Sequence, residues 1–286
     1  MDLKSLIDEP SKLPTIPKVG QLLMASFSSD NVSVSEIAHQ LSADPALSAK
    51  LLKLANSAYF HVSRTIGTVD AALQMLGLVM VRNLVLGNSV ASAYKATPGM
   101  DLPQFWRYNL CTACAARWLA WRTDVNSDRV FTLALLHAIG QLQMHAIAPK
   151  AVAALDGQMS VLDPRRAQLE LQTFGFDHGE VSAALAQAWH FPPPLIEALR
   201  HIARPLAAPE FLEASALVHL GTWRARGEVL GWSDDVQLSS YPFDVAERLH
   251  LPPDWTPALA ARAHFDAVKI MPPMAELTEG LEDLFD

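Results

Sequence analysis

Cysteine is scarce in this 286-residue sequence, with only two, and charged residues make up just 18% of it. Two cysteines allow at most one disulfide, which cannot brace a chain of this size, so we predict a reducing, cytoplasmic location. Apolar runs such as residues 71–81 stop short of the roughly 20 residues that a membrane span needs. The N-terminal residues contain acids and no apolar segment, which is not typical of a secretory signal. We therefore expect no membrane association.

Basic residues are outnumbered: 22 Lys and Arg stand against 30 Asp and Glu, a net charge of −8. The acid excess lies after residue 95. Proteins that bind nucleic acid gain much of their affinity by neutralising phosphates with Lys and Arg, so this balance disfavours nucleic-acid partners. Half of the residues are hydrophobic, which is enough to build a sizeable core.

Strand signals are missing too, because we find no convincing alternation of β-branched residues. Helix-start chemistry recurs instead. Asp44 before Pro45 places an acid at an N-cap and proline in the first turn, and Thr68 and Asp177 are further N-caps. Gly77 is placed to end the helix that Thr68 starts. Apolar residues follow these caps at helical spacing, so we predict an all-α fold.

Breaks in the helical pattern predict how the chain is organised. Pro98 and Gly99 interrupt it where the charge balance changes, and residues 227–242 are expected to form a loop. We predict these parts: an N-terminal tail at residues 1–12, one domain at 13–250, and a C-terminal helical extension with an acidic tail at 251–286. Within the domain, an N-terminal helical lobe (13–95) is expected to pack on a second helical lobe (100–230).

Residues 33–56 have the outline of a DNA-binding helix-turn-helix. Ser33 and Glu36 form a capping box at the start of the first helix. The second helix, however, offers only Lys50 and Lys53 as bases, and no arginine to bind guanine. A pair of packed amphipathic helices is the commoner explanation, so a helix-turn-helix transcription regulator is an alternative only.

Several short motifs follow one another in the first third of the chain: a Pro-x-x-Pro segment, an Asp-Pro pair, an Asn-Ser pair and a Leu-Gly pair. Together they resemble the HDOD family, the HD-related output domains of bacterial signalling proteins. The resemblance implies an all-helical fold with an HD-like second lobe and a bacterial source, and it names no reaction. The residues that carry it are Pro14, Pro17, Asp44, Pro45, Asn56, Ser57, Leu76 and Gly77.

The related HD phosphohydrolases bind metal through a histidine, an adjacent His-Asp pair and a later aspartate. Divalent metals use such imidazole and carboxylate ligands and supply hydroxide for attack on phosphorus. At the matching positions this sequence has Tyr108, His137, Ala138 and Thr222, so only the second histidine is retained. The resemblance therefore implies a protein that is not an enzyme and needs no cofactor.

Other side chains could still carry chemistry. His137, His178 and His201 fall near positions that hold histidines in the HD-GYP phosphodiesterases, cousins that degrade a cyclic dinucleotide, and three imidazoles could hold zinc. Because the bridging carboxylates are missing, we favour packing or capping roles and predict no metal site. Cys111 and Cys114 share one helix face and are expected to pack in the core.

We predict a non-catalytic signalling module that acts through protein–protein interaction, in second-messenger-linked control of motility, stress or biofilm formation. The candidate ligand or partner groove is formed by Tyr108, His137, His178 and His201. A metal-dependent phosphohydrolase or cyclic-dinucleotide phosphodiesterase with atypical ligands is the second alternative.

Overall fold

The computed structural model describes residues 2–7, 13, 18–25, 33–57, 60, 62–260 and 270–281. Every regular element in these ranges is a helix, and no strand occurs among them, which confirms the predicted all-α fold. The α-helices are α1 (Lys18–Ala25), α2 (Val34–Ser42), α3 (Pro45–Ala55), α4 (Val69–Ala93), α5 (Leu102–Ala120), α6 (Ser127–Leu136), α7 (Ile139–Ile147), α8 (Pro149–Asp156), α9 (Arg166–Phe174), α10 (His178–Ala188), α11 (Pro193–His201), α12 (Glu213–Val229), α13 (Asp234–Ser239), α14 (Phe243–Arg248), α15 (Pro257–Ala260) and α16 (Met274–Thr278). Short 3₁₀ turns lie at Lys4–Leu6, Pro205–Ala207 and Pro253–Trp255.

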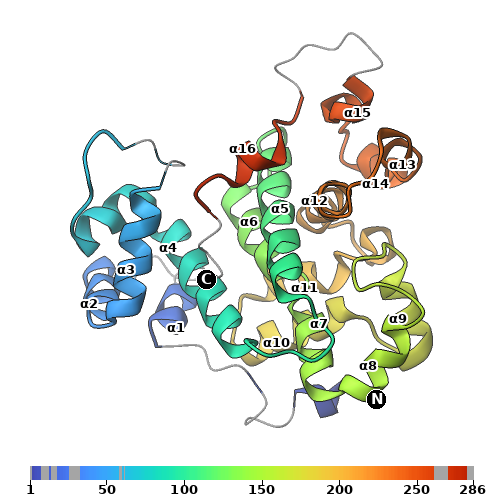
Figure 1. Cartoon of the computed structure of the whole chain (residues 1–286), viewed down its shortest axis with the longest axis horizontal. Coiled ribbons are helices and arrows are strands. Elements are labelled where there is room, and N and C mark those ends of the chain that lie inside the picture. The colour runs from blue at the N-terminus through green and yellow to red at the C-terminus, as the bar shows by residue number, and fades with distance from the viewer. Residues whose placement is uncertain are drawn as a thin grey trace.

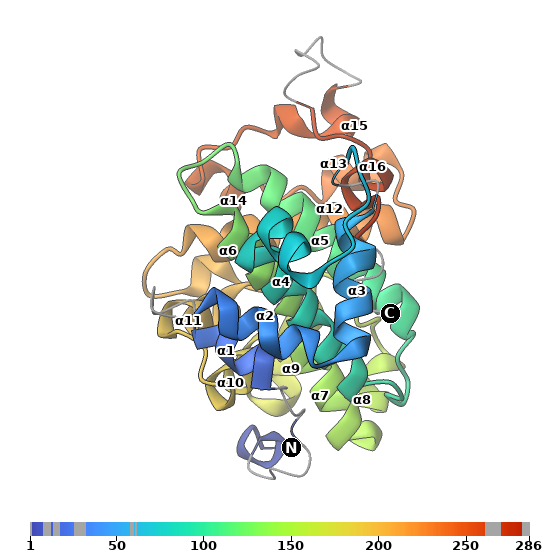
Figure 2. The ribbon, with the colours of Figure 1, turned by 90° about the vertical axis from the view of Figure 1, so that its left-hand side faces the viewer.

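Helices α1 to α4 make up the N-terminal part, on the left in Figure 1 and towards the viewer in Figure 2. Local polar contacts set the ends of α3. The Oδ1 atom of Asp44 accepts hydrogen bonds of 2.9 and 3.0 Å from two backbone N–H groups of its first turn, with Pro45 as its first residue. At the other end, the side-chain amide of Asn56 donates to the carbonyls of Leu52 and Ile66 and accepts from the Ile66 N–H. Asn56 thus fastens the following loop to α3.

Gly77 interrupts α4 without ending it. Its φ of 72° and ψ of 162° are non-helical and belong to a region that only glycine enters readily. The prediction that Thr68 starts this helix is confirmed, since its hydroxyl accepts from the Ala71 N–H. The predicted end falls at Gly77, where the kink divides α4 into two helical segments, and apolar residues of the second segment, such as Leu84, are buried in the core.

Helix α5 lies at the centre of the rest of the molecule, packed along α6 and α12 (Figure 1). The Oδ1 atom of Asp101 caps its start by accepting from the Gln104 N–H at 3.0 Å. Small residues such as Ala113 and Ala116 on α5 are fully buried, which lets neighbouring helices approach closely. This three-helix centre supplies two walls of the site described below.

One hydrophobic core runs from Val19 to Leu281 and includes residues of both predicted lobes. Two buried hydrogen bonds also join them. The Thr132 hydroxyl donates to Asn83 Oδ1, and the Tyr94 hydroxyl donates to Gln143 Oε1, each at 2.6 Å. Helix α16 packs against α5.

Some expectations need correction or lie outside the described residues. The loop predicted at 227–242 is wrong, because α12 continues to Val229 and α13 occupies Asp234–Ser239. Ser233 caps α13 by accepting from the Val236 N–H, so the serine and aspartates mark a helix start. Pro14 and Pro17 lie outside the described residues, as do parts of the predicted tail and C-terminal extension.

Two helical spans in the described part of the chain, Val69–Ala93 and Ser127–Ile147, are long and apolar enough to cross a membrane. Their most apolar windows are 56% and 89% buried inside the protein. Burial of this extent is what core helices show, and it accounts for their composition.

Candidate functional site

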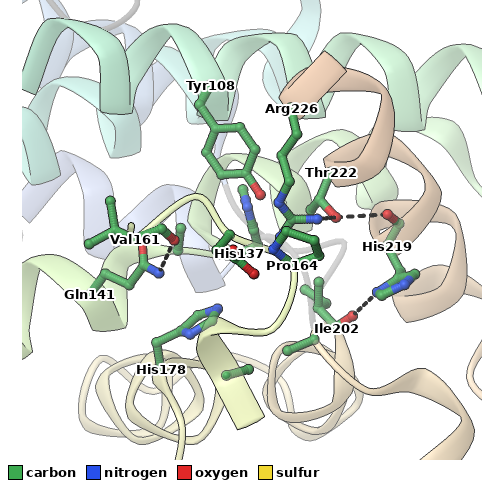
Figure 3. A pocket seen from close by; sticks show the side chains of 14 residues that line it. Tyr108, His137, Gln141, Val161, Pro164, His178, Ile202, His219, Thr222 and Arg226 are labelled. Carbon is green, nitrogen blue, oxygen red and sulfur yellow. Dashed lines mark hydrogen bonds between the residues drawn. The ribbon is translucent and has the colours of Figure 1, made fainter. Parts of the chain in front are cut away.

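A small polar pocket lies between α5, α7, α9, α10 and α12 (Figure 3). The centre of a water-sized group can move within about 20 Å³ of it, so the pocket has room for a small ion and for nothing as large as a nucleotide. The residues that line it are Tyr108, His137, Ala138, Gln141, Val161, Asp163, Pro164, Ala167, His178, Ile202, Ala203, His219, Thr222 and Arg226.

All four positions matched to the metal ligands of HD phosphohydrolases line this pocket. Tyr108 comes from α5, His137 and Ala138 from the junction of α6 and α7, and Thr222 from α12. They are as much as 114 positions apart in the chain (222 minus 108) and meet only in the fold. The sequence pattern therefore indicates residues that the fold brings together in one pocket.

The structure brings together three of the four residues of the predicted groove. His178, the first residue of α10, lines the pocket with Tyr108 and His137. His201 is not part of its lining, because its Nε2 is bonded to Glu197 Oε1 at 2.9 Å, one turn earlier on α11. The predicted set of three histidines thus reduces to two at this site.

His137 presents a hydrogen-bond acceptor to the pocket. Its Nδ1 lies 2.6 Å from the Ala134 carbonyl oxygen, which can only accept, so Nδ1 carries the proton and Nε2 carries the lone pair. Nε2 is buried and has no hydrogen-bond partner among the described residues. Burial lowers the pKa of His137 from 6.5 to about 3 against the effect of the Ala134 bond, and the positive charges of His178 and Arg226 lower it further. The ring is therefore neutral, and it packs edge-on against Tyr108, with ring centres 5.2 Å apart.

The surroundings of His178 favour its protonated form, the opposite of His137. Its Nδ1 lies 2.7 Å from Glu170 Oε2, and its backbone N–H donates to the same oxygen. Arg166, whose side chain is as buried as that of Glu170, donates from Nε to Oε1 at 3.0 Å. Burial alone would lower the pKa of His178, but the charge and hydrogen bond of Glu170 raise it above the ordinary value. His178 therefore favours its protonated form, with Nε2–H as a donor.

One face of α12 supplies a row of polar groups at positions i, i+3 and i+7: His219, Thr222 and Arg226. The Nδ1–H of His219 donates to the Ile202 carbonyl at 2.9 Å. The Thr222 hydroxyl donates to the His219 carbonyl at 2.7 Å and accepts from Arg226 Nη1 at 3.1 Å (Figure 3). Burial, then the charge of Arg226, lowers the pKa of His219 to about 4.

Arg226 brings a positive charge to the pocket. Among the described residues, no carboxylate lies within ion-pair distance of its guanidinium. Its charge acts on Tyr108, His137 and His219 alike. Asp163 also lines the pocket, but its carboxylate is bonded to Arg165 at 3.0 and 3.1 Å, and that bond lowers its pKa. The Nε of Arg226 is buried without a hydrogen-bond partner among the described residues.

Ser182 and Gly140 fix the two histidines relative to each other. The Ser182 hydroxyl lies within hydrogen-bond distance of the carbonyls of His137 and His178, at 3.0 and 2.9 Å, and accepts from the Gly140 N–H. A Cβ atom on Gly140 would lie 2.1 Å from the His178 carbonyl oxygen. Only glycine allows α7 and α10 to approach this closely.

Sequence reasoning missed Arg226, His219 and Gln141. The available signal was the spacing of the polar residues on α12. This spacing places them on one face of a helix whose other residues are mostly buried. Gln141 gave a weaker signal, since it follows Ala138 by one helical turn on α7. Its Nε2 donates to the Val161 carbonyl at 2.9 Å, while its Oε1 is buried without a hydrogen-bond partner in the described chain.

Other predicted features lie elsewhere. The described motif residues of the N-terminal part, from Asp44 to Gly77, are not part of the pocket lining. Lys50, one of two bases on the would-be recognition helix, donates to Asn88 Oδ1 of α4. Cys111 and Cys114 are both buried, as expected for core residues, and burial raises the pKa of Cys111 to about 11.

Comparison with known proteins gives one family match and several similar structures. The model of the HDOD domain family matches residues 13–205, more than half of the chain. The structure of a candidate phosphohydrolase from Shewanella amazonensis SB2B superposes with a TM-score of 0.70 at 25% identity, over 98% of this chain and 96% of that one. An HDOD domain protein of unknown function from Geobacter sulfurreducens gives 0.67 at 22% identity, over 86% and 87%. A candidate signal transduction protein from Marinobacter aquaeolei VT8 gives 0.69 at 21% identity, over 89% and 56%.

A curated relative of unknown role also matches. It is an uncharacterized protein of Treponema pallidum (strain Nichols), 26% identical over 210 residues. The match covers 72% of this chain and 41% of the relative, so the chain spans less than half the length of that protein.

Proposed function

The chain belongs to the HDOD domain family, and on this premise we propose that it is a non-catalytic regulatory module of a bacterial signalling pathway. It acts in the cytoplasm by binding another protein, and the pocket around His137 and Arg226 is its ligand-sensing or partner-contacting site. The output is second-messenger-linked control of motility, stress or biofilm formation.

The donor set of the pocket is the observation that supports a non-catalytic role. A divalent metal of the kind that HD phosphohydrolases use prefers carboxylate and imidazole ligands. Here Ala138 has no donor atom, Tyr108 and Thr222 offer hydroxyls, and the guanidinium of Arg226 brings a positive charge that repels a cation. These residues do not fit such a metal, and we derive no hydrolytic step through one.

Elemental mass spectrometry tests this proposal. The protein is expressed with added manganese, iron and zinc and purified without a histidine tag. We expect less than about 0.1 metal ion per chain and no hydrolysis of cyclic dinucleotides, because hydrolysis of this kind requires the bound ion. A content near one or two ions, with turnover, would overturn the non-catalytic role.

Partner binding is tested separately, by crosslinking the protein in extracts of its own cells and identifying what is captured. The matched variant carries Tyr108→Phe and His137→Phe, which keep an aromatic ring at each position and remove the polar atoms. We expect the variant to fold. We expect the proteins that it captures to differ from those captured by the unmodified protein by the loss or gain of a defined partner. If both proteins capture the same partners equally, the pocket takes no part in the proposed interaction.

A metal-dependent phosphohydrolase with atypical ligands is the second candidate. Two observations favour it: the likeness to a candidate phosphohydrolase of Shewanella amazonensis, and two imidazoles, His137 and His219, whose Nδ1 protons leave Nε2 free as a ligand atom. In that case His137→Ala must abolish bound metal and turnover together.

A further inference from the structure

The size of the pocket limits what its interior can hold. A volume of about 20 Å³ admits one small group and excludes a nucleotide base or a sugar ring. A ligand therefore enters either as a small free ion or by one terminal group. The atoms on the wall then decide its chemistry.

Charge on the wall favours an anion. The guanidinium of Arg226 has no carboxylate at ion-pair distance among the described residues, and its Nε proton is buried and unpartnered. His178 has its Nδ1 2.7 Å from Glu170 Oε2, and this carboxylate raises the pKa of His178, which favours an Nε2–H as a second donor. Asp163 is the opposing charge, and Arg165 already binds it in bidentate fashion. Guanidinium groups bind planar and tetrahedral oxoanions through paired N–H bonds.

Two other atoms of the pocket wall require a hydrogen-bond donor, which a fully deprotonated anion lacks. The Nε2 of His137 and the Oε1 of Gln141 are acceptors, both buried and both without a partner in the described chain. A fully deprotonated oxoanion would place its lone pairs against theirs. A hydroxyl on the same ligand would instead donate a hydrogen bond, and unmade bonds of this kind are costly when buried.

We propose that the pocket binds an oxoanion that retains a proton, of the class of bicarbonate or hydrogen phosphate. Its negative oxygens bind Arg226 and His178, and its hydroxyl donates to His137 Nε2 or Gln141 Oε1. This inference rests on the proposed function, because it names the ligand class of the same pocket.

Titration calorimetry near pH 8 tests the proposal with two pairs of ions of like shape, at matched ionic strength in chloride buffer. Bicarbonate and nitrate are both planar, and hydrogen phosphate and sulfate are both tetrahedral. In each pair only the first keeps a proton. We expect the protonated member of at least one pair to bind about tenfold or more tightly than its counterpart.

Two variants separate charge from proton recognition. Arg226→Gln is expected to abolish binding of both members of the pair. His137→Phe keeps an aromatic ring beside Tyr108 and removes the acceptor, so it should erase the preference while weak binding of both ions persists. His201→Gln, outside the pocket lining, is the control and should bind as the unmodified protein does.

Folding of each variant is checked by circular dichroism and by its melting temperature without ligand. Equal binding within both pairs, or no binding of any of the four ions by the unmodified protein, would overturn the proposal. Tight binding by bicarbonate or hydrogen phosphate near pH 8 identifies a free ion. A phosphate monoester loses its last proton near pH 6, so it is tested at about pH 5, where binding at least as tight as that of inorganic phosphate identifies a terminal group. Metal content and partner capture do not involve these ions, so the proposed function and this inference can fail independently.

Discussion

His137 and His178 lie in one pocket, yet their surroundings move their pKa values in opposite directions. His137 is lowered to about 3 by burial and by neighbouring positive charge, while the Glu170 carboxylate raises His178 despite its burial. Neutral His137 therefore costs no stability while it is also neutral in the unfolded chain, and it lowers stability once the unfolded chain binds a proton there, below a pH of about 6.5. Protonated His178 stabilises it below an unfolded pKa near 6.5, and this contribution is lost as pH rises through its native pKa.

The first prediction concerns acid stability. As pH falls below about 6.5, the unfolded chain takes up a proton at His137 that the native state refuses, so stability falls by up to about 1.4 kcal/mol per pH unit from this group. The variant His137→Phe lacks the group and should show a shallower loss between about pH 6 and 4. Urea midpoints measured across that range test this. His39→Gln, at an exposed position on α2, should keep the steep slope of the unmodified protein, and equal slopes in all three proteins would contradict the assignment.

The second prediction concerns Glu170, which neutralises both Arg166 and His178 from a site that is 1% exposed. Replacing it with Gln leaves the buried Arg166 with one carboxylate fewer and should cost about 3–5 kcal/mol of stability. The pKa of His178, followed by NMR, should fall. Glu197→Gln, which removes the exposed partner of His201, should change stability by less than about 1 kcal/mol. Similar losses in the two variants would show that Glu170 does not hold this network.

At the scale of elements, the approach of α7 to α10 places the two histidines, and it depends on Gly140. A Cβ atom there would lie 2.1 Å from the His178 carbonyl oxygen and 2.8 Å from the Ser182 nitrogen, both on the backbone. Backbone cannot rotate away as a flexible side chain can, so the helices themselves would have to separate.

The third prediction follows from this contact. Gly140→Ala should destabilise the protein by about 2 kcal/mol or more and should alter the near-ultraviolet circular dichroism of the pocket region. Gly157→Ala is the matched control. It has a helical backbone conformation and no contact closer than 3.7 Å, so alanine should be neutral or slightly stabilising there. An equally mild Gly140→Ala would mean that the two helices are not held at this distance.

The elements also show what a sequence can and cannot predict. Caps such as Asp44, Thr68 and Asp177 were predictable because the hydrogen bonds that cap a helix are made to its own first turn. The pocket was found through spacing that resembles a known family, which indicated Tyr108 and Thr222. Arg226 was missed because the spacing of polar residues on α12 indicates a shared polar face but not which neighbouring residues that face meets.

At the scale of the whole molecule, the predicted lobes share one core. Buried residues from α1 to the segment after α16 belong to it, and the bonds from Asn83 to Thr132 and from Tyr94 to Gln143 cross between the lobes. Separating the lobes would expose apolar surface on both and break these two hydrogen bonds. Neither lobe should therefore unfold at equilibrium while the other stays folded.

The fourth prediction is a single unfolding transition. All seven tryptophans lie from residue 106 onward, so their fluorescence follows only the second lobe and what comes after it. Hydrogen exchange at the amides of α3, read by mass spectrometry along a urea series, follows the N-terminal lobe. We expect the same urea midpoint from both probes, and Asn83→Ala should lower both together because it removes an interaction that the lobes share. Exchange in α3 at a lower urea concentration than the fluorescence change would instead show that the N-terminal helices open independently, and the boundary at residues 95–100 would then separate two folding units.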